Sequence, residues 1–212
     1  MSGSFITPSF RERIRGLATP FATGLGRLGL TPNALTVIGF LGTCAAAVAA
    51  ATQAWVVAGM LVIVFGIFDM FDGALARATG KASKFGAFLD STLDRTGESL
   101  VLAGVAIGSA IAGFLEGVLL AGLAATFASG VTYTRAKAEA LGVHGEVGVA
   151  PRPERLILLA AGLVLAGMLG GVSTYSAGNA PLIVALGLIT ILSAITILQR
   201  IVHVKRQLGN EQ

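Results

Sequence analysis

Two long stretches without a charged residue most constrain what this chain can fold into. No Asp, Glu, Lys or Arg occurs from Leu28 to Phe68 or from Leu156 to Gln199, and a third stretch, 99–134, carries only Glu116. Each stretch can hold two helices of about 20 residues, the length that crosses the hydrocarbon core of a bilayer. The sequence therefore predicts an all-α integral membrane protein with six transmembrane helices. Five is the alternative, if one stretch holds a re-entrant segment.

The charged residues support this topology. Only 12% of the residues are charged, about half the share found in a soluble domain. The 15 lysines and arginines fall before the first predicted span, around every second connection and after the last span. The positive-inside rule makes that face cytoplasmic, with both termini on it, in a multi-pass protein of the cell membrane. The net charge of +4 then serves orientation and attraction to anionic lipids, and it does not indicate a nucleic-acid partner.

We expect three regions along the chain: an N-terminal interfacial helix at 1–30, a transmembrane domain that carries any catalytic site at 31–206, and a tail at 207–212. Apolar residues recur in the first region at spacings of three and four: Phe10, Ile14, Leu17, Phe21 and Leu25. This spacing is typical of an amphipathic helix that lies in the membrane interface. Such a helix would anchor the chain or control the entry of a lipid.

Four aspartates stand out at the predicted junction of the second and third spans: Asp69, Asp72, Asp90 and Asp94. Their spacings put each pair on one face of a helix, and two antiparallel helices would bring the pairs together. Carboxylates this close repel one another and lose solvation, so they need protons or cations. An anionic site made of oxygen ligands suits Mg²⁺ or Mn²⁺. Four carboxylates can hold two such ions, an arrangement typical of phosphoryl transfer.

Residues near the aspartates fit a bound diphosphate. Gly73 and Gly86 have no side chain, so a ligand can approach the backbone at both positions. Arg77 lies within about a turn of the second aspartate, and its guanidinium can hold phosphate oxygens through two hydrogen bonds. Thr31 can cap a helix that begins at Pro32, and such a helix N-terminus favours an anion.

The spacing D-x2-D-G-x2-A-R-x8-G-x3-D-x3-D, from Asp69 to Asp94, resembles the CDP-alcohol phosphotransferase family of integral membrane enzymes. The resemblance implies that Asp69, Asp72 and Asp90 hold one metal ion and that Asp69, Asp90 and Asp94 hold the other. It also implies that Asp94 is the catalytic general base and that the protein is a homodimer. By the same resemblance, the contacts to CDP-diacylglycerol fall to Thr31, Pro32, Asn33, Ala34, Gly73, Arg77 and Ser83.

Basic residues at the ends of the later spans point to an acceptor that carries a phosphate. They are Arg135, Lys137, Arg155 and Arg200. A neutral alcohol would not need permanent cations beside metal ions, whereas a phosphate would. We attribute Arg152 to the positive-inside pattern instead.

The segments YTRAKAEALG, RPERL and ILQR resemble the acceptor side of actinobacterial phosphatidylinositol-phosphate synthases. This resemblance implies that 1D-myo-inositol 3-phosphate is the acceptor and that phosphatidylinositol phosphate is the product. Arg135 and Lys137 reverse the order of basic residues usual in those enzymes, which leaves open which of the two contacts the phosphate. Glycerol 3-phosphate, as in phosphatidylglycerophosphate synthases, is the close alternative. A cation transporter is the alternative from another class, but the carboxylates gather at one end of two spans.

Overall fold

The structure, a computed structural model, describes Gly24, Gly26 and residues 29–209, and the regular structure in that part of the chain is helical. The helices are α2 (Pro32–Ala51), α3 (Trp55–Ala78), α4 (Lys84–Ile111), α5 (Leu115–Ala140), α6 (Arg152–Met168) and α7 (Asn179–Gly209). The prediction of an all-α protein is confirmed. The interfacial helix expected at 1–30 lies almost wholly outside the described residues, and α7 continues three residues into the expected tail.

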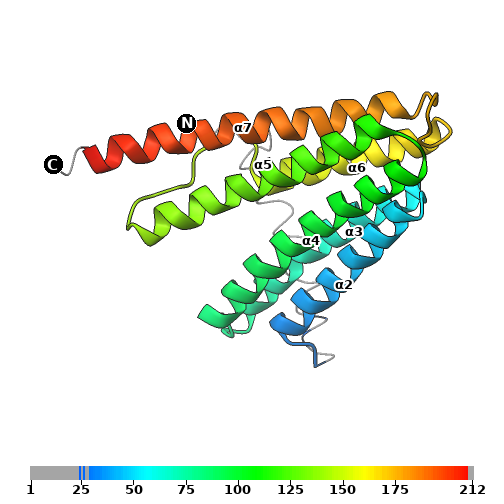
Figure 1. The fold of residues 1–212 in the computed structure, drawn as a ribbon. Coiled ribbons are helices and arrows are strands. Elements are labelled where there is room, and N and C mark those ends of the chain that lie inside the picture. The colour runs from blue at the N-terminus through cyan, green and yellow to red at the C-terminus, as the bar shows by residue number, and fades with distance from the viewer. Residues whose placement is uncertain (1–23, 25, 27–28, 210–212) are drawn as a thin grey trace.

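Consecutive helices run in opposite directions, so the connections alternate between two ends of the bundle (Figure 1). The connections α3–α4 and α5–α6 and the end of α7 share one end with the start of α2. Local sequence fixes these starts. Thr31 caps α2 by accepting a hydrogen bond from the Ala34 N–H at 3.2 Å, and Ser83 caps α4 through the Gly86 N–H at 3.0 Å. Capping of this kind satisfies amides that have no partner within the helix.

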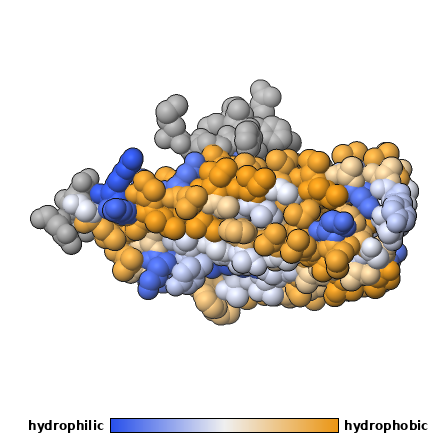
Figure 2. Space-filling view, turned by 45° about the horizontal axis from the view of Figure 1, so that its top comes forward, coloured by the Kyte–Doolittle hydropathy of each residue, from blue (hydrophilic) through white to orange (hydrophobic). Residues whose placement is uncertain are grey.

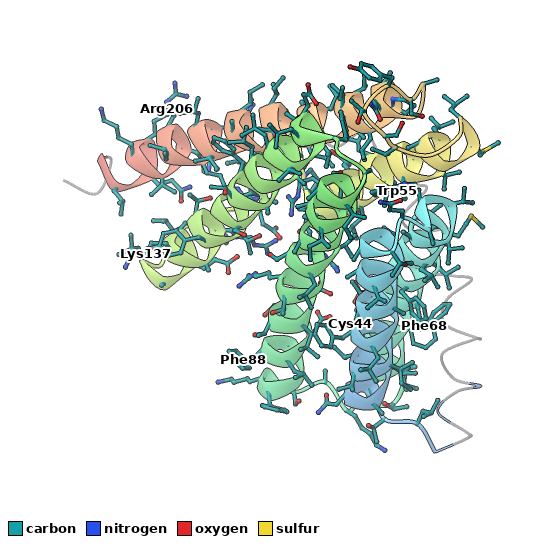
Figure 3. All side chains as sticks on the ribbon, turned by 45° about the vertical axis from the view of Figure 1, so that its right-hand side comes forward. Cys44, Trp55, Phe68, Phe88, Lys137 and Arg206 are labelled. Carbon is teal, nitrogen blue, oxygen red and sulfur yellow. The ribbon has the colours of Figure 1, made fainter. Side chains whose placement is uncertain are left out.

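The helices form two groups that share a seam. The first group is α2 packed on α3 and α4, and the second is α7 packed on α5 and α6. The seam joins α3 to α6 and α4 to α5. Helices α4 and α5 lie close together at the end that holds their connection and diverge toward the opposite end (Figures 1 and 3). The diverging end carries the aspartates and the basic residues.

Four of the described helices, α2, α3, α5 and α7, are long and apolar enough to cross a membrane. Figure 2 shows a surface that is largely hydrophobic on the face in view. The six predicted spans include two further helices that are less apolar or shorter. Helix α6 has only 17 residues. The first half of α4 carries basic residues as well as two of the aspartates. The structure thus describes a helical protein with four candidate membrane spans, and four of its described helices, α3, α4, α6 and α7, bury at least one charged side chain.

Close backbone contact holds α2 against α4. Gly104 and Gly108 of α4 face the carbonyl oxygens of Ala47 and Ala50 in α2, and a Cβ atom at either glycine would overlap those oxygens. Small residues at such contacts let two helices approach closely in lipid, where van der Waals packing drives association. This contact fixes the position of α4, and hence of the aspartates that α4 carries.

We predict that Gly104→Val lowers the stability of the folded protein. The added side chain must push α2 away, and overpacking of this kind costs about 1–3 kcal/mol. A thermal unfolding scan of the purified protein in detergent measures the change. Gly122→Val is the matched control, because a Cβ at Gly122 meets nothing within 4 Å. Equal midpoints for the two variants would contradict the close contact.

Candidate metal and substrate site

The structure brings the carboxylates of α3 and α4 together. Oxygens of Asp69, Asp72 and Asp90 all lie within 4.8 Å of one another, a spacing that allows one cation to contact all three. These donors are all carboxylate oxygens, the ligands that Mg²⁺ and Mn²⁺ take in proteins. The residues present therefore fit a divalent metal ion. We call Asp69, Asp72 and Asp90 the aspartate trio.

Helix α2 adds a contact that the sequence analysis missed. The hydroxyl of Thr36 donates to Asp72 Oδ2 at 2.5 Å, and the Gly73 N–H donates to Asp72 Oδ1. Asp72 is buried, so these donors satisfy its carboxylate oxygens and hold them in place. The only signal in the sequence was a hydroxyl one turn into a predicted span, which is common in membrane helices.

Asp94 lies outside the aspartate trio and pairs with an arginine. Arg152 Nη1 donates to Asp94 Oδ2 at 2.5 Å and to Asp69 Oδ2 at 2.9 Å. The sequence analysis attributed Arg152 to membrane orientation alone, and that interpretation was incomplete. One feature of Arg152 indicated acidic neighbours: it is the first residue of α6. The positive end of the helix dipole disfavours a cation there, so nearby acids were needed to account for it.

A cavity of about 210 Å³ opens beside the aspartate trio, between α2 and the α3–α4 connection. Its lining includes five of the seven residues expected to contact a CDP-linked lipid: Pro32, Asn33, Gly73, Arg77 and Ser83. The other two lie at the start of α2, where Thr31 caps the helix and Ala34 supplies the capped amide. The cavity lining also includes Asp72 and Asp90, so a ligand in it would reach the metal site.

Two glycines keep this cavity open. A Cβ at Gly86 would lie 3.1 Å from both Asn33 Oδ1 and Ser83 Oγ, and a Cβ at Gly73 would lie 3.3 Å from Arg77 Nη1. Each distance is tighter than ordinary van der Waals contact, so a side chain would crowd the polar groups that line the cavity. The expectation that a ligand approaches the backbone at Gly73 and Gly86 agrees with this geometry.

The arginines expected to bind the acceptor phosphate already have protein partners. Arg155 Nε and Nη2 each donate to Glu98 at 2.8 Å, and Arg155 Nη1 donates to the Ala150 carbonyl at 2.9 Å. Arg200 Nε donates to the Val147 carbonyl at 2.8 Å, and its Nη1 donates to the Val131 carbonyl. Both side chains are buried. They therefore position the α5–α6 connection as well as adding positive charge.

Arg135 is more accessible and pairs with Glu139 at 2.8 Å and Glu146 at 2.5 Å. The positive charges of Arg135 and Arg155 each oppose that of Arg200. Lys137 lines a groove between α5 and α7 and points away from α4 (Figure 3). Arg200 lines the same groove as Lys137, so Arg200 is a neighbour of each of the other three basic residues expected to bind the acceptor.

We predict that Glu98→Gln destabilises the protein, because it leaves the guanidinium of Arg155 without a charged partner. The two side chains are 7% and 2% exposed, and breaking a buried ion pair costs about 3–5 kcal/mol. The thermal midpoint in detergent measures the effect. Glu116→Gln, an exposed glutamate in the first turn of α5, is the control and should leave the midpoint unchanged. A wild-type midpoint for Glu98→Gln would exclude a structural role for the pair.

Known proteins similar to this chain belong to one family. The sequence profile of the CDP-alcohol phosphatidyltransferase family matches residues 29–199. The chain is 36% identical to a phosphatidylinositol phosphate synthase of Mycobacteroides abscessus, over 94% of this chain and 88% of the relative. It is 38% identical to an archaetidylinositol phosphate synthase of Pyrococcus horikoshii, over 97% of both chains.

Solved structures with the same fold include phosphatidylinositol phosphate synthase of Mycobacterium tuberculosis with CDP-DAG bound. The TM-score is 0.80 at 32% identity, and the match covers 89% of this chain and 93% of that one. The same enzyme in complex with manganese and citrate gives a TM-score of 0.78 at 31% identity, with 88% of each chain covered.

Proposed function

The chain belongs to the CDP-alcohol phosphatidyltransferase family, and on that premise we propose that it transfers a phosphatidyl group from CDP-diacylglycerol to 1D-myo-inositol 3-phosphate. The products are phosphatidylinositol phosphate and CMP. The aspartate trio beside a cavity that includes Arg77 carries this proposal. The M. tuberculosis structure with CDP-DAG bound supports the donor. The two named relatives differ in the lipid part of their names and share inositol phosphate, which supports the acceptor.

Residues of the cavity would bind the donor. Arg77 offers a planar guanidinium that can hold two oxygens of the diphosphate at once. Asn33 and Ser83 add neutral polar groups, and Gly73 and Gly86 leave the room that a close contact needs. The start of α2, capped by Thr31 through the Ala34 N–H, turns the positive end of the helix dipole toward the negative charge of the ligand. The acyl chains would remain in the surrounding bilayer.

The aspartate trio would hold one Mg²⁺ ion, and Asp94 with Asp69 and Asp90 would hold a second, with Mn²⁺ as a possible replacement. Divalent ions bound there would neutralise the diphosphate and the charge that develops as CMP leaves. The manganese complex of the M. tuberculosis enzyme supports a divalent ion in a relative of this fold.

Asp94 would act as the general base. An acceptor hydroxyl gives its proton to the Asp94 carboxylate, and its oxygen forms a bond to the phosphorus that carries diacylglycerol. The bond from that phosphorus to the CMP oxygen breaks, so CMP leaves with the electron pair. Arg135, Lys137 and Arg200 would hold the acceptor phosphate and so present the hydroxyl to Asp94. Arg155, whose three nitrogens all donate to protein acceptors, would add positive charge beside them.

The arrangement in the membrane follows from charge. All six helices would span the bilayer, with the aspartate end and both termini on the cytoplasmic side, because basic residues cluster at that end. The 31–206 region would be the catalytic domain, with 1–30 as an interfacial helix and 207–212 as a tail. The protein would act as a homodimer among membrane lipids.

We predict that Asp94→Asn lowers turnover by roughly 10²–10⁴-fold, the range that a general base contributes, and leaves CDP-diacylglycerol binding largely intact. Release of CMP from the purified enzyme with Mg²⁺ measures turnover, and EDTA should abolish it in the wild type. The acceptor is identified in the same assay by comparing inositol 3-phosphate, glycerol 3-phosphate and free inositol. Turnover near the wild-type rate in the variant would refute the base, and faster release with glycerol 3-phosphate would refute the acceptor.

We predict that Arg135→Gln raises the KM for inositol 3-phosphate more than Lys137→Gln does. Residues two apart on a helix do not share a face, and the Lys137 side chain points away from α4, the helix that carries Asp94 (Figure 3). Loss of a hydrogen bond to a charged group costs about 1.5–3 kcal/mol, or roughly 10- to 100-fold in KM. Steady-state kinetics with each substrate varied in turn provide the measurement. The KM for CDP-diacylglycerol should stay constant, and a larger effect from Lys137→Gln would reverse the assignment.

A further inference from the structure

We propose that Arg152 is a built-in cation that occupies the second metal position until that ion binds. In this state its guanidinium neutralises Asp69 and Asp94 together. Arg152 must withdraw before Asp94 can bind a metal ion or accept a proton from the acceptor. The proposal rests on the two metal positions and the general base proposed above, but not on the choice of acceptor.

One nitrogen makes both contacts. Arg152 Nη1, at the start of α6, lies 2.9 Å from Asp69 Oδ2 on α3 and 2.5 Å from Asp94 Oδ2 on α4. A cation shared by two carboxylates from two helices is placed as a bridging metal ion would be. The Asp94 oxygen held this way already accepts a hydrogen bond, so it cannot take a proton from the acceptor until Arg152 leaves.

The cavity that all three side chains line has little room for an ion. The cavity lined by Asp69, Asp94 and Arg152 has a volume of only about 20 Å³, which is room for one water molecule. A hydrated cation that contacts both Asp69 and Asp94 would overlap the guanidinium. Arg152 and an ion on these two carboxylates are therefore alternatives.

A comparison with Arg155 shows that Arg152 is held loosely. All three nitrogens of Arg155 donate hydrogen bonds to protein acceptors, and its side chain is 2% exposed. Arg152 donates only through Nη1, its buried Nε has no hydrogen-bond partner among the described residues, and its side chain is 25% exposed. A buried donor without a partner raises the free energy of the observed state. Arg155 is thus a fixed structural group, while Arg152 can leave its position at a lower cost.

The two metal positions should therefore load unequally. The aspartate trio can bind a first ion without disturbing Asp94. That ion draws on Asp69, which weakens the bond between Asp69 and Arg152. A second ion must then displace Arg152 from Asp94, so its affinity includes the cost of breaking an ion pair.

We predict that Arg152→Gln tightens the second metal site by at least about tenfold and changes the first site less. Titration of the detergent-purified protein with Mn²⁺ alone, followed by electron paramagnetic resonance of the free ion, gives both dissociation constants without substrate. Arg95→Gln is the matched control. It removes the same charge one residue from Asp94, but Arg95 is exposed and makes no ion pair among the described residues. The proposal is overturned if Arg152→Gln leaves the second constant unchanged, weakens it, or shifts it no more than Arg95→Gln does.

Thermal stability gives a second readout. In EDTA, Arg152→Gln should melt below the wild type, because Asp69 and Asp94 are then unpaired, and saturating Mn²⁺ should raise its midpoint more than it raises that of the wild type. An equal rise in both proteins would contradict the proposal.

If the variant does not fold, the wild type supplies the test. A structure determined with saturating Mn²⁺ should place Arg152 beyond hydrogen-bond distance of Asp94, and an intact contact with two ions bound would overturn the proposal. These measurements use no acceptor, so a wrong choice of acceptor would not affect them.

Discussion

Repulsion among four carboxylates is the constraint on which the rest of this structure depends. Asp69, Asp72, Asp90 and Asp94 lie where a membrane protein has little water to screen them. The fold answers with donors from other helices. Thr36 on α2 binds Asp72, and Arg152 on α6 binds Asp69 and Asp94. The aspartate trio remains as a position for a divalent ion. Helices α2 and α6 thus each contribute a donor that stabilises the negative charge of the site.

This balance requires that α4 be fixed relative to its neighbours. At the end remote from the site, Gly104 and Gly108 press α4 against the backbone of α2. Nearer the site, the buried pair of Glu98 and Arg155 ties α4 to α6. The first contact is made by the absence of side chains and the second by complementary charge. Together they let α4 and α5 diverge at the aspartate end while the carboxylates keep their positions.

The part of the site that could be predicted from the sequence is the part formed by short spacings. The aspartates, Gly73, Gly86 and Arg77 belong to two consecutive helices, and helical periodicity alone brings them together. Contacts across long separations escaped prediction, because nothing in the sequence sets how α6 lies against α3 and α4. Arg152 therefore passed for an orientation charge. Arg155 and Arg200 were expected to serve the acceptor alone, whereas their hydrogen bonds also support the α5–α6 connection.

The pairing of Arg152 with Asp69 and Asp94 also bears on how such a protein is made. Synthesis proceeds from the N-terminus, so α3 and α4 are made before α6. Until α6 is made, Asp69 and Asp94 lack the counter-charge of Arg152 and depend on protons or cations. Once α6 is in place, the bundle can close and remain closed in a compartment where magnesium is scarce. Biogenesis and activation then become separate events, and a chain truncated before α6 should be an early target for membrane quality control.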